Sequence, residues 1–135
     1  MQISYKKKEY LQTRSEHELF LALKKAVTED IVVIPQVQLG RILDMTCQPA
    51  VSKCKYYFYH GINQLSFDFV LFNKSFTALV AVELDDKSHL RRERKSRDKF
   101  VEEVCKEAEL PLLRLPVTEN YDFSDLREKI TKILH

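Results

Sequence analysis

The sequence is poor in chain breakers, with only 2 Gly and 4 Pro among its 135 residues. This scarcity excludes a long linker, a low-complexity tail and a collagen-like repeat. No apolar run approaches the ~18 residues of a membrane-spanning helix, and the opening MQISYKKKEYLQ has no apolar stretch typical of a signal peptide. We therefore expect a single domain over residues 1–135 that is cytoplasmic and has no membrane partner.

The sequence also has few cysteines and a small net charge. The three cysteines stand at positions 47, 54 and 105, an odd number that argues against a disulfide framework and favours a reducing compartment. Cys47 and Cys54 have no second pair with which to complete a zinc site. The 22 basic and 20 acidic residues leave a formal charge of only +2, so no global field draws the chain to a polyanion. Any nucleic-acid site must come from local clustering.

What is present is a clear succession of helical and strand patterns. Apolar residues at helical spacing predict a first helix over residues 13–28, with Thr13 and Glu16 as a capping box and Ser15 with Glu18 as the competing box. In this helix the acid at position 16 projects onto the middle of the apolar stripe, which is unusual. Further strands are predicted over residues 31–39, 55–60, 66–72, 78–84 and 112–115, and further helices over 91–110 and from a cap at Ser124.

The order of these elements predicts a mixed α/β fold. A loop of hairpin length joins the strands at 66–72 and 78–84, so these strands should be antiparallel neighbours. A helix separates the second of them from the strand at 112–115. Such a crossover connection implies that this last pair is parallel.

Carboxylates on the two hairpin strands are the main candidates for a functional site. Asp68 interrupts a strand that is apolar on both faces, where an unpaired acid is costly. Glu83 and Asp85 share one face of the next strand, and hairpin pairing places Asp68 across from them. Three carboxylates this close either keep a proton or hold a cation, and their oxygens select Mg²⁺ or Mn²⁺. The competing interpretation is that these acids merely end strands at the solvent edge.

A basic stretch follows the acidic strand directly. His89 is a candidate general base because histidine titrates near neutral pH, although a surface histidine is the plain alternative. Most of the basic residues at 91–99 fall on the solvent side of the predicted helix. Arg97 instead extends the inner stripe, where it either clamps a substrate phosphate or pairs with Glu83 or Asp85.

Four short runs of this sequence, DFVL at 68–71, VELDDKSH at 82–89, RD at 97–98 and LPLLR at 110–114, resemble a known family. It is an uncharacterised bacterial family, the domain of unknown function twenty-seven twenty-six. That family is placed in the PD-(D/E)XK nuclease-like superfamily, near the very-short-patch-repair endonuclease branch. The resemblance covers residues 11–121 and implies a restriction-endonuclease-like three-layer core with helix-strand-strand-strand-helix-strand order.

By this resemblance, Glu16 matches the helix-one acid, Asp68 the metal-binding aspartate and Glu83 the second acid of the superfamily. Asp85 stands where the superfamily has a lysine. In the repair-endonuclease branch a nearby histidine takes over as base, and His89 is similarly placed. Family members fused to topoisomerase-type zinc fingers imply a larger DNA-processing assembly, although this chain has no such finger.

Residues and resemblance together predict a Mg²⁺- or Mn²⁺-dependent phosphodiesterase acting on DNA. The alternative is a catalytically silent nucleic-acid-binding or interaction module, which the missing lysine and the near-neutral charge favour. A weaker third interpretation is a nuclease of RNA or modified nucleic acid. The candidate catalytic residues are Glu16, Asp68, Glu83, Asp85 and His89, the candidate metal ligands are Asp68, Glu83 and Asp85, and the candidate phosphate contacts are Lys87 and Arg97.

Overall fold

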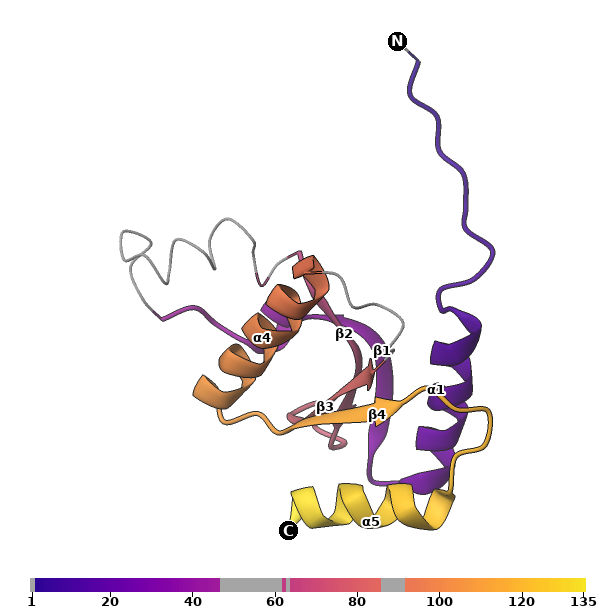
Figure 1. Cartoon of the computed structure of the whole chain (residues 1–135), viewed down its shortest axis with the longest axis vertical. Coiled ribbons are helices and arrows are strands. Elements are labelled where there is room, and N and C mark those ends of the chain that lie inside the picture. The colour runs from indigo at the N-terminus through magenta and orange to yellow at the C-terminus, as the bar shows by residue number, and fades with distance from the viewer. Residues whose placement is uncertain (1, 47–61, 63, 86–91) are drawn as a thin grey trace.

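The computed structural model describes residues 2–46, 62, 64–85 and 92–135, which contain both helices and strands (Figure 1). The predicted strand at 55–60 lies outside the described residues. The elements are α1 (Arg14–Ala26), β1 (Val32–Gln38), α2 (Leu39–Ile42), β2 (Ser66–Phe72), β3 (Ala78–Asp85), α4 (Arg92–Glu107), β4 (Leu112–Pro116) and α5 (Phe123–Leu134).

These four strands form one open mixed sheet in the order β1-β2-β3-β4. The pairs β1–β2 and β2–β3 are antiparallel, and β3–β4 is parallel. The parallel pair confirms the crossover predicted from the helix between those strands. The predicted hairpin loop is closed by Asn73, whose Oδ1 accepts hydrogen bonds from the backbone N–H groups of Ser75 and Thr77 at 3.0 and 2.9 Å.

Helices cover both faces of the sheet, so that its strands contribute to two cores (Figure 1). On one face α1 and α5 pack against Phe69 and Val82. On the other face α2 and α4 pack against Val70 and Ala81. Neighbouring residues thus alternate between the cores, which explains why β2 and β3 read as apolar on both sides. None of the helices in the described ranges is long and apolar enough to cross a membrane.

The start of α1 follows the first of the two capping boxes predicted from the sequence. Thr13 Oγ1 accepts the backbone N–H of Glu16 at 3.2 Å, and Glu16 Oε1 accepts the N–H of Thr13 at 2.8 Å. This reciprocal pair satisfies two donors that the first helical turn leaves free. Glu18, the acid of the competing box, instead has its Oε1 4.0 Å from Arg14 Nε.

Two predicted helix boundaries were wrong by a few residues. The cap of α5 is Asp122 rather than Ser124, because Asp122 Oδ1 accepts the N–H groups of Ser124 and Asp125 at 3.0 and 3.2 Å. Helix α4 ends at Glu107, and the chain then takes a left-handed residue at Glu109 (φ 55°). The predicted helix over 91–110 included Ala108, which instead follows the end of α4 and is exposed.

Candidate carboxylate site

The site lies where the ladder between β2 and β3 opens. Phe69 and Val82 are the last paired positions of the two strands, and the same register places Asp68 opposite Glu83. Beyond this point β2 continues along β1, while β3 continues along β4. The two carboxylates therefore stand at a fork in the sheet.

Hydrogen bonds from backbone N–H groups to the two carboxylates replace the ladder at this fork. The N–H of Asp68 donates to Glu83 Oε2 at 3.1 Å, and the N–H of Leu84 donates to Asp68 Oδ2 at 2.7 Å. Each acid thus accepts a backbone donor of the opposite strand. A buried N–H without a partner is costly, so these two bonds allow the strands to part without losing satisfied donors.

Glu83 is buried to an unusual degree for an acid. It is 3% exposed, and within the described ranges it is the one polar or charged residue in the buried interior. Burial, together with the nearby charge of Asp68, raises the pKa of Glu83 to about 7, while Arg97 opposes the rise. Near pH 7 the protonated and ionised forms of this carboxyl group are therefore present in comparable amounts.

Arg97 reaches the site from α4 and supplies the positive charge beside Glu83. Its Nη2 lies 3.1 Å from Glu83 Oε1 and donates a hydrogen bond to Ser66 O at 3.0 Å. The contact with Oε1 is an ion pair without an aligned hydrogen bond, so this buried oxygen keeps an unused lone pair. Of the two roles that the sequence left open for Arg97, the structure contains the pairing with Glu83.

A second arginine, Arg114, links α4 to the edge of the sheet beside Glu83. It is the cross-strand partner of Glu83 in the β3–β4 pair. Its guanidinium contacts Asp98 Oδ2 at 3.5 Å and Glu102 Oε1 at 3.3 Å, and Asp98 also contacts Arg97 at 3.3 Å. Arg114 was not predicted as a site residue, although a charged residue inside the short apolar run LLRLP was a signal that could have revealed it.

Glu16 approaches the site through Gln36 and not by direct contact. Its Oε2 accepts a hydrogen bond from Gln36 Nε2 at 2.7 Å. Gln36 has a left-handed backbone (φ 54°) and, by the β1–β2 register, stands opposite Asp68. Glu16 is half-buried, and neither a hydrogen bond nor an ion pair joins it to Asp68 or Glu83. Gln36 was not predicted as a site residue, although the proline before it, Pro35, was a signal that the strand is irregular at this point.

Asp85 does not join the other two carboxylates. It shares a face with Glu83, but two residues of strand separate their Cα atoms by about 7 Å, and Asp85 is exposed at the end of β3. Across the described part of the chain, no three His, Cys, Asp or Glu side chains are grouped to hold a metal. Lys87 and His89 lie outside the described residues, as do Cys47 and Cys54.

The pair Asp68 and Glu83 nevertheless suits a hard divalent cation. Both residues offer carboxylate oxygens, the ligands that Mg²⁺ and Mn²⁺ prefer. The buried Oε1 of Glu83 has no hydrogen bond to give up. Mg²⁺ usually binds through one or two carboxylates and completes its shell with water and substrate oxygens, so two acids are sufficient in number.

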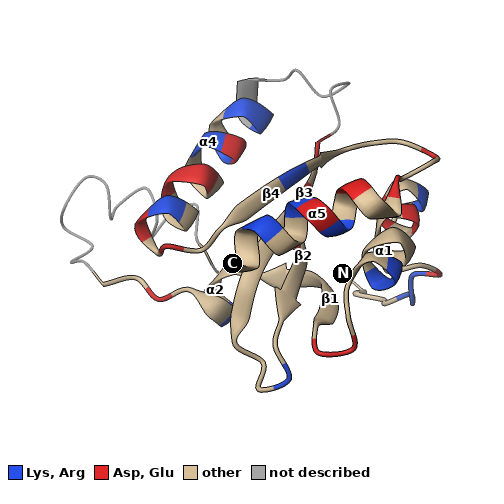
Figure 2. Cartoon of the chain, turned by 90° about the horizontal axis from the view of Figure 1, so that it is seen from below, with Lys and Arg blue, Asp and Glu red and all other residues tan. Residues whose placement is uncertain are grey.

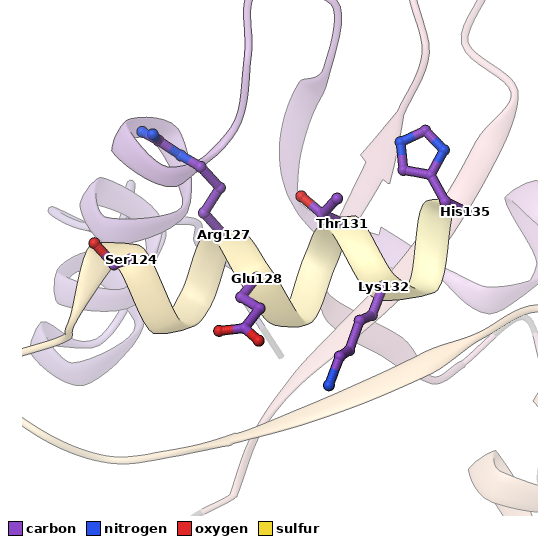
Figure 3. Close-up of a pocket in the computed structure, with 6 residues that line it drawn as sticks. All are labelled: Ser124, Arg127, Glu128, Thr131, Lys132 and His135. Atoms are coloured by element: carbon purple, nitrogen blue, oxygen red, sulfur yellow. The ribbon is translucent and has the colours of Figure 1, made fainter.

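A pocket of about 640 Å³ lies elsewhere, along α5 (Figure 3). None of the carboxylate-site residues lines it. Arg127 reaches from this pocket toward α1, where its Nε donates to Ala26 O at 3.1 Å and its Nη2 to Lys25 O at 3.4 Å. It thus satisfies carbonyls at the C-terminal end of α1, which is a structural task. The lining residues are Ser124, Arg127, Glu128, Thr131, Lys132 and His135.

Fold and site define a mixed α/β domain with a carboxylate pair at a fork between two central strands. The sequence profile of the family described as "Protein of unknown function (DUF2726)" matches residues 8–133, and the chain belongs to this family. An uncharacterized protein of Haemophilus influenzae (strain ATCC 51907 / DSM 11121 / KW20 / Rd) is 25% identical over 127 residues, covering 92% of this chain. The chain spans 62% of that relative's length. No solved structure matches the chain of this protein, residues 1–135.

Proposed function

We propose that the protein is a metal-dependent phosphodiesterase that cleaves DNA and has the restriction-endonuclease-like core of the PD-(D/E)XK superfamily. The observation that carries the proposal is the Asp68–Glu83 pair at the fork of the sheet. Glu83 is buried and its Oε1 has a free lone pair, while Asp68 is half-buried. Such a pair is expensive to maintain unless it binds a cation or a proton.

Each residue of the site has a part in this proposal. Asp68 and Glu83 supply the hard oxygens, and Glu83, with its pKa near 7, releases its proton easily when a cation arrives. A bound Mg²⁺ or Mn²⁺ would supply a water of lowered pKa and positive charge for the phosphate. We retain Asp85 as an outer ligand, Lys87 as a phosphate contact and His89 as the base.

Glu16 has an indirect part through Gln36. By holding the Gln36 amide at 2.7 Å, it keeps that side chain in one orientation across from Asp68. Gln36 is thereby a positioning residue for the proposed metal site.

The second candidate function is a catalytically silent nucleic-acid-binding or interaction module. The observation that favours it is the ion pair at 3.1 Å between Arg97 and Glu83, since an internal cation already neutralises the buried acid. The presence of Asp85 at the usual lysine position points the same way. In this case the carboxylate pair serves the fold and not a reaction.

Thermal melting with and without Mn²⁺, combined with nicking of supercoiled plasmid, separates the two functions. For the enzyme we expect Mn²⁺ to stabilise the wild-type protein and to support nicking, because a ligand of the folded state alone raises its stability. Asp68→Asn and Glu83→Gln should lose both effects.

Matched controls for these two variants are Asp30→Asn and Glu119→Gln, which remove the same charges from exposed positions. Both controls should behave as the wild type. If the wild-type protein shows neither a metal-dependent shift nor cleavage of single- or double-stranded DNA or RNA, the silent module is correct.

A further inference from the structure

The segment before α1 is an arm that projects from the rest of the protein. We call residues 2–11 the N-terminal arm; Figure 1 shows it running away from the sheet and helices. Tyr5 and Tyr10 are 93% and 73% exposed, although tyrosine usually buries much of its ring. The three consecutive lysines at 6–8 are exposed and pair with none of the acids that the structure describes.

The arm also accounts for the net charge of the whole chain. It contains three of the 22 basic residues and one of the 20 acidic residues. The remaining chain therefore has 19 of each and is formally neutral. Figure 2 shows the two signs interspersed along α4 and α5. The arm is thus one of two local excesses of positive charge that a polyanion meets, the other being residues 91–99, with six basic and two acidic residues.

The root of the arm lies close to the carboxylate site. The arm is followed by Gln12 and then by Thr13, whose backbone N–H donates to the Glu16 side chain, and this side chain also accepts from Gln36. Gln36 stands opposite Asp68 in the β1–β2 register. A chain of two hydrogen bonds therefore connects the start of α1 to the strand position across from the metal-binding candidate.

We propose that the N-terminal arm binds single-stranded nucleic acid and holds it beside the Asp68–Glu83 pair. The lysines would neutralise phosphates, and Tyr5 and Tyr10 would stack on bases, whose faces are open in a single strand and hidden in a duplex. In fully extended chain the Cα atoms of these two tyrosines are at most ~18 Å apart, so both rings can reach one short stretch of a single strand.

The preference for nucleic acid over other polyanions rests on the proposed phosphodiesterase function. The interaction itself needs no catalysis. It is therefore measured in a chelating buffer, where metal-dependent cleavage does not occur. The binding proposal can then be disproved without disproving the phosphodiesterase proposal, and the phosphodiesterase proposal without disproving binding by the arm.

The test is fluorescence anisotropy of labelled 12-nucleotide deoxythymidine and uridine oligomers over a series of salt concentrations. Lys6, Lys7 and Lys8 are changed together to Gln. We expect the wild type to bind with a log–log salt slope near −2, since each neutralised phosphate of a single strand contributes about −0.7. The lysine variant should lose most of this slope. The matched control changes Lys74, Lys129 and Lys132 to Gln, three exposed lysines of the body, and should retain the slope.

A second variant, Tyr5→Leu with Tyr10→Leu, keeps apolar area but removes the stacking rings. It should bind the oligomers at least roughly 30-fold more weakly with an unchanged salt slope, because two bases each lose stacking worth about 1–3 kcal/mol. Melting temperatures should stay constant in all variants, since these arm side chains are exposed.

Three results would overturn the proposal. The first is equal loss of binding in the arm variant and the body control. The second is an oligomer affinity that does not respond to removal of the tyrosines, which indicates a general polyanion site. The third is tyrosine-dependent binding to anionic vesicles without binding to the oligomers, which indicates a lipid surface.

Discussion

The backbone N–H of Asp68 donates to the carboxylate of Glu83, while the carboxylate of Asp68 accepts the N–H of the residue that follows Glu83. Each acid therefore has a structural task in addition to the proposed function. A substitution that removes the carboxylate oxygens removes a hydrogen-bond acceptor as well as a charge. Isosteric amides separate these two effects, because their carbonyl oxygen still accepts.

Replacement of Asp68 should show this separation in the absence of metal. Asp68→Ala leaves the N–H of Leu84 without its acceptor, so we expect a loss of about 1–3 kcal/mol in the free energy of unfolding. Asp68→Asn keeps the acceptor and relieves repulsion with Glu83, so it should cost less. Urea denaturation in a chelating buffer measures both, with Asp44→Ala as the exposed control. Equal stability of the two Asp68 variants would contradict the capping role.

The raised pKa of Glu83 predicts a specific pH dependence of stability. The folded protein retains a proton up to about pH 7 that the unfolded chain releases near its ordinary value of 4.5. Stability should therefore fall as pH rises through this window and level off above it, by at most roughly 3 kcal/mol. Glu83→Gln should remove this slope. Urea midpoints from pH 4.5 to 8 measure it, and parallel wild-type and variant curves would refute the assignment.

Arg97 and Arg114 form a matched pair for testing the electrostatics of the site, since both contact Asp98 but only Arg97 contacts Glu83. Arg97→Gln should destabilise the metal-free protein at pH 8 by up to about 3 kcal/mol, because Glu83 loses its buried partner. The same change should strengthen Mn²⁺ binding, since a competing cation is gone. Arg114→Gln should leave Mn²⁺ binding unchanged.

Titration calorimetry with Mn²⁺ and urea denaturation provide the two readouts for these arginine variants. A purely structural role of Arg97 predicts lower stability with no gain in metal affinity. That result would rule out competition between the arginine and the metal.

Cys105 should be chemically inert in the folded protein. It is 2% exposed, and burial, with a smaller effect from Glu83, raises the pKa of its thiol to about 12. The thiolate that reacts with iodoacetamide is therefore nearly absent at pH 8. Peptide mapping by mass spectrometry should find this residue unlabelled in buffer and labelled in urea. Rapid labelling of the native protein would show that α4 opens readily.

Local and periodic information was sufficient to predict much of this fold. The apolar run at residues 66–72 and the short loop after it predicted β2 and the hairpin with their observed bounds. The capping box of Thr13 with Glu16 was likewise readable, because its partners are three residues apart. Local information failed where neighbouring residues compete for one role, as Asp122 and Ser124 do for the cap of α5. Family membership followed from the short motifs alone.

The amino-acid sequence by itself determined that Asp68 and Glu83 would lie on adjacent central strands, since the apolar pattern and the hairpin require it. Only the tertiary structure decided that the strands part between these residues, that Arg97 pairs with Glu83, and that Gln36 connects Glu16 to the site. The physical reason is that these contacts join residues from 14 to 20 positions apart in the sequence. Their geometry depends on strand register and helix packing, which no local pattern encodes.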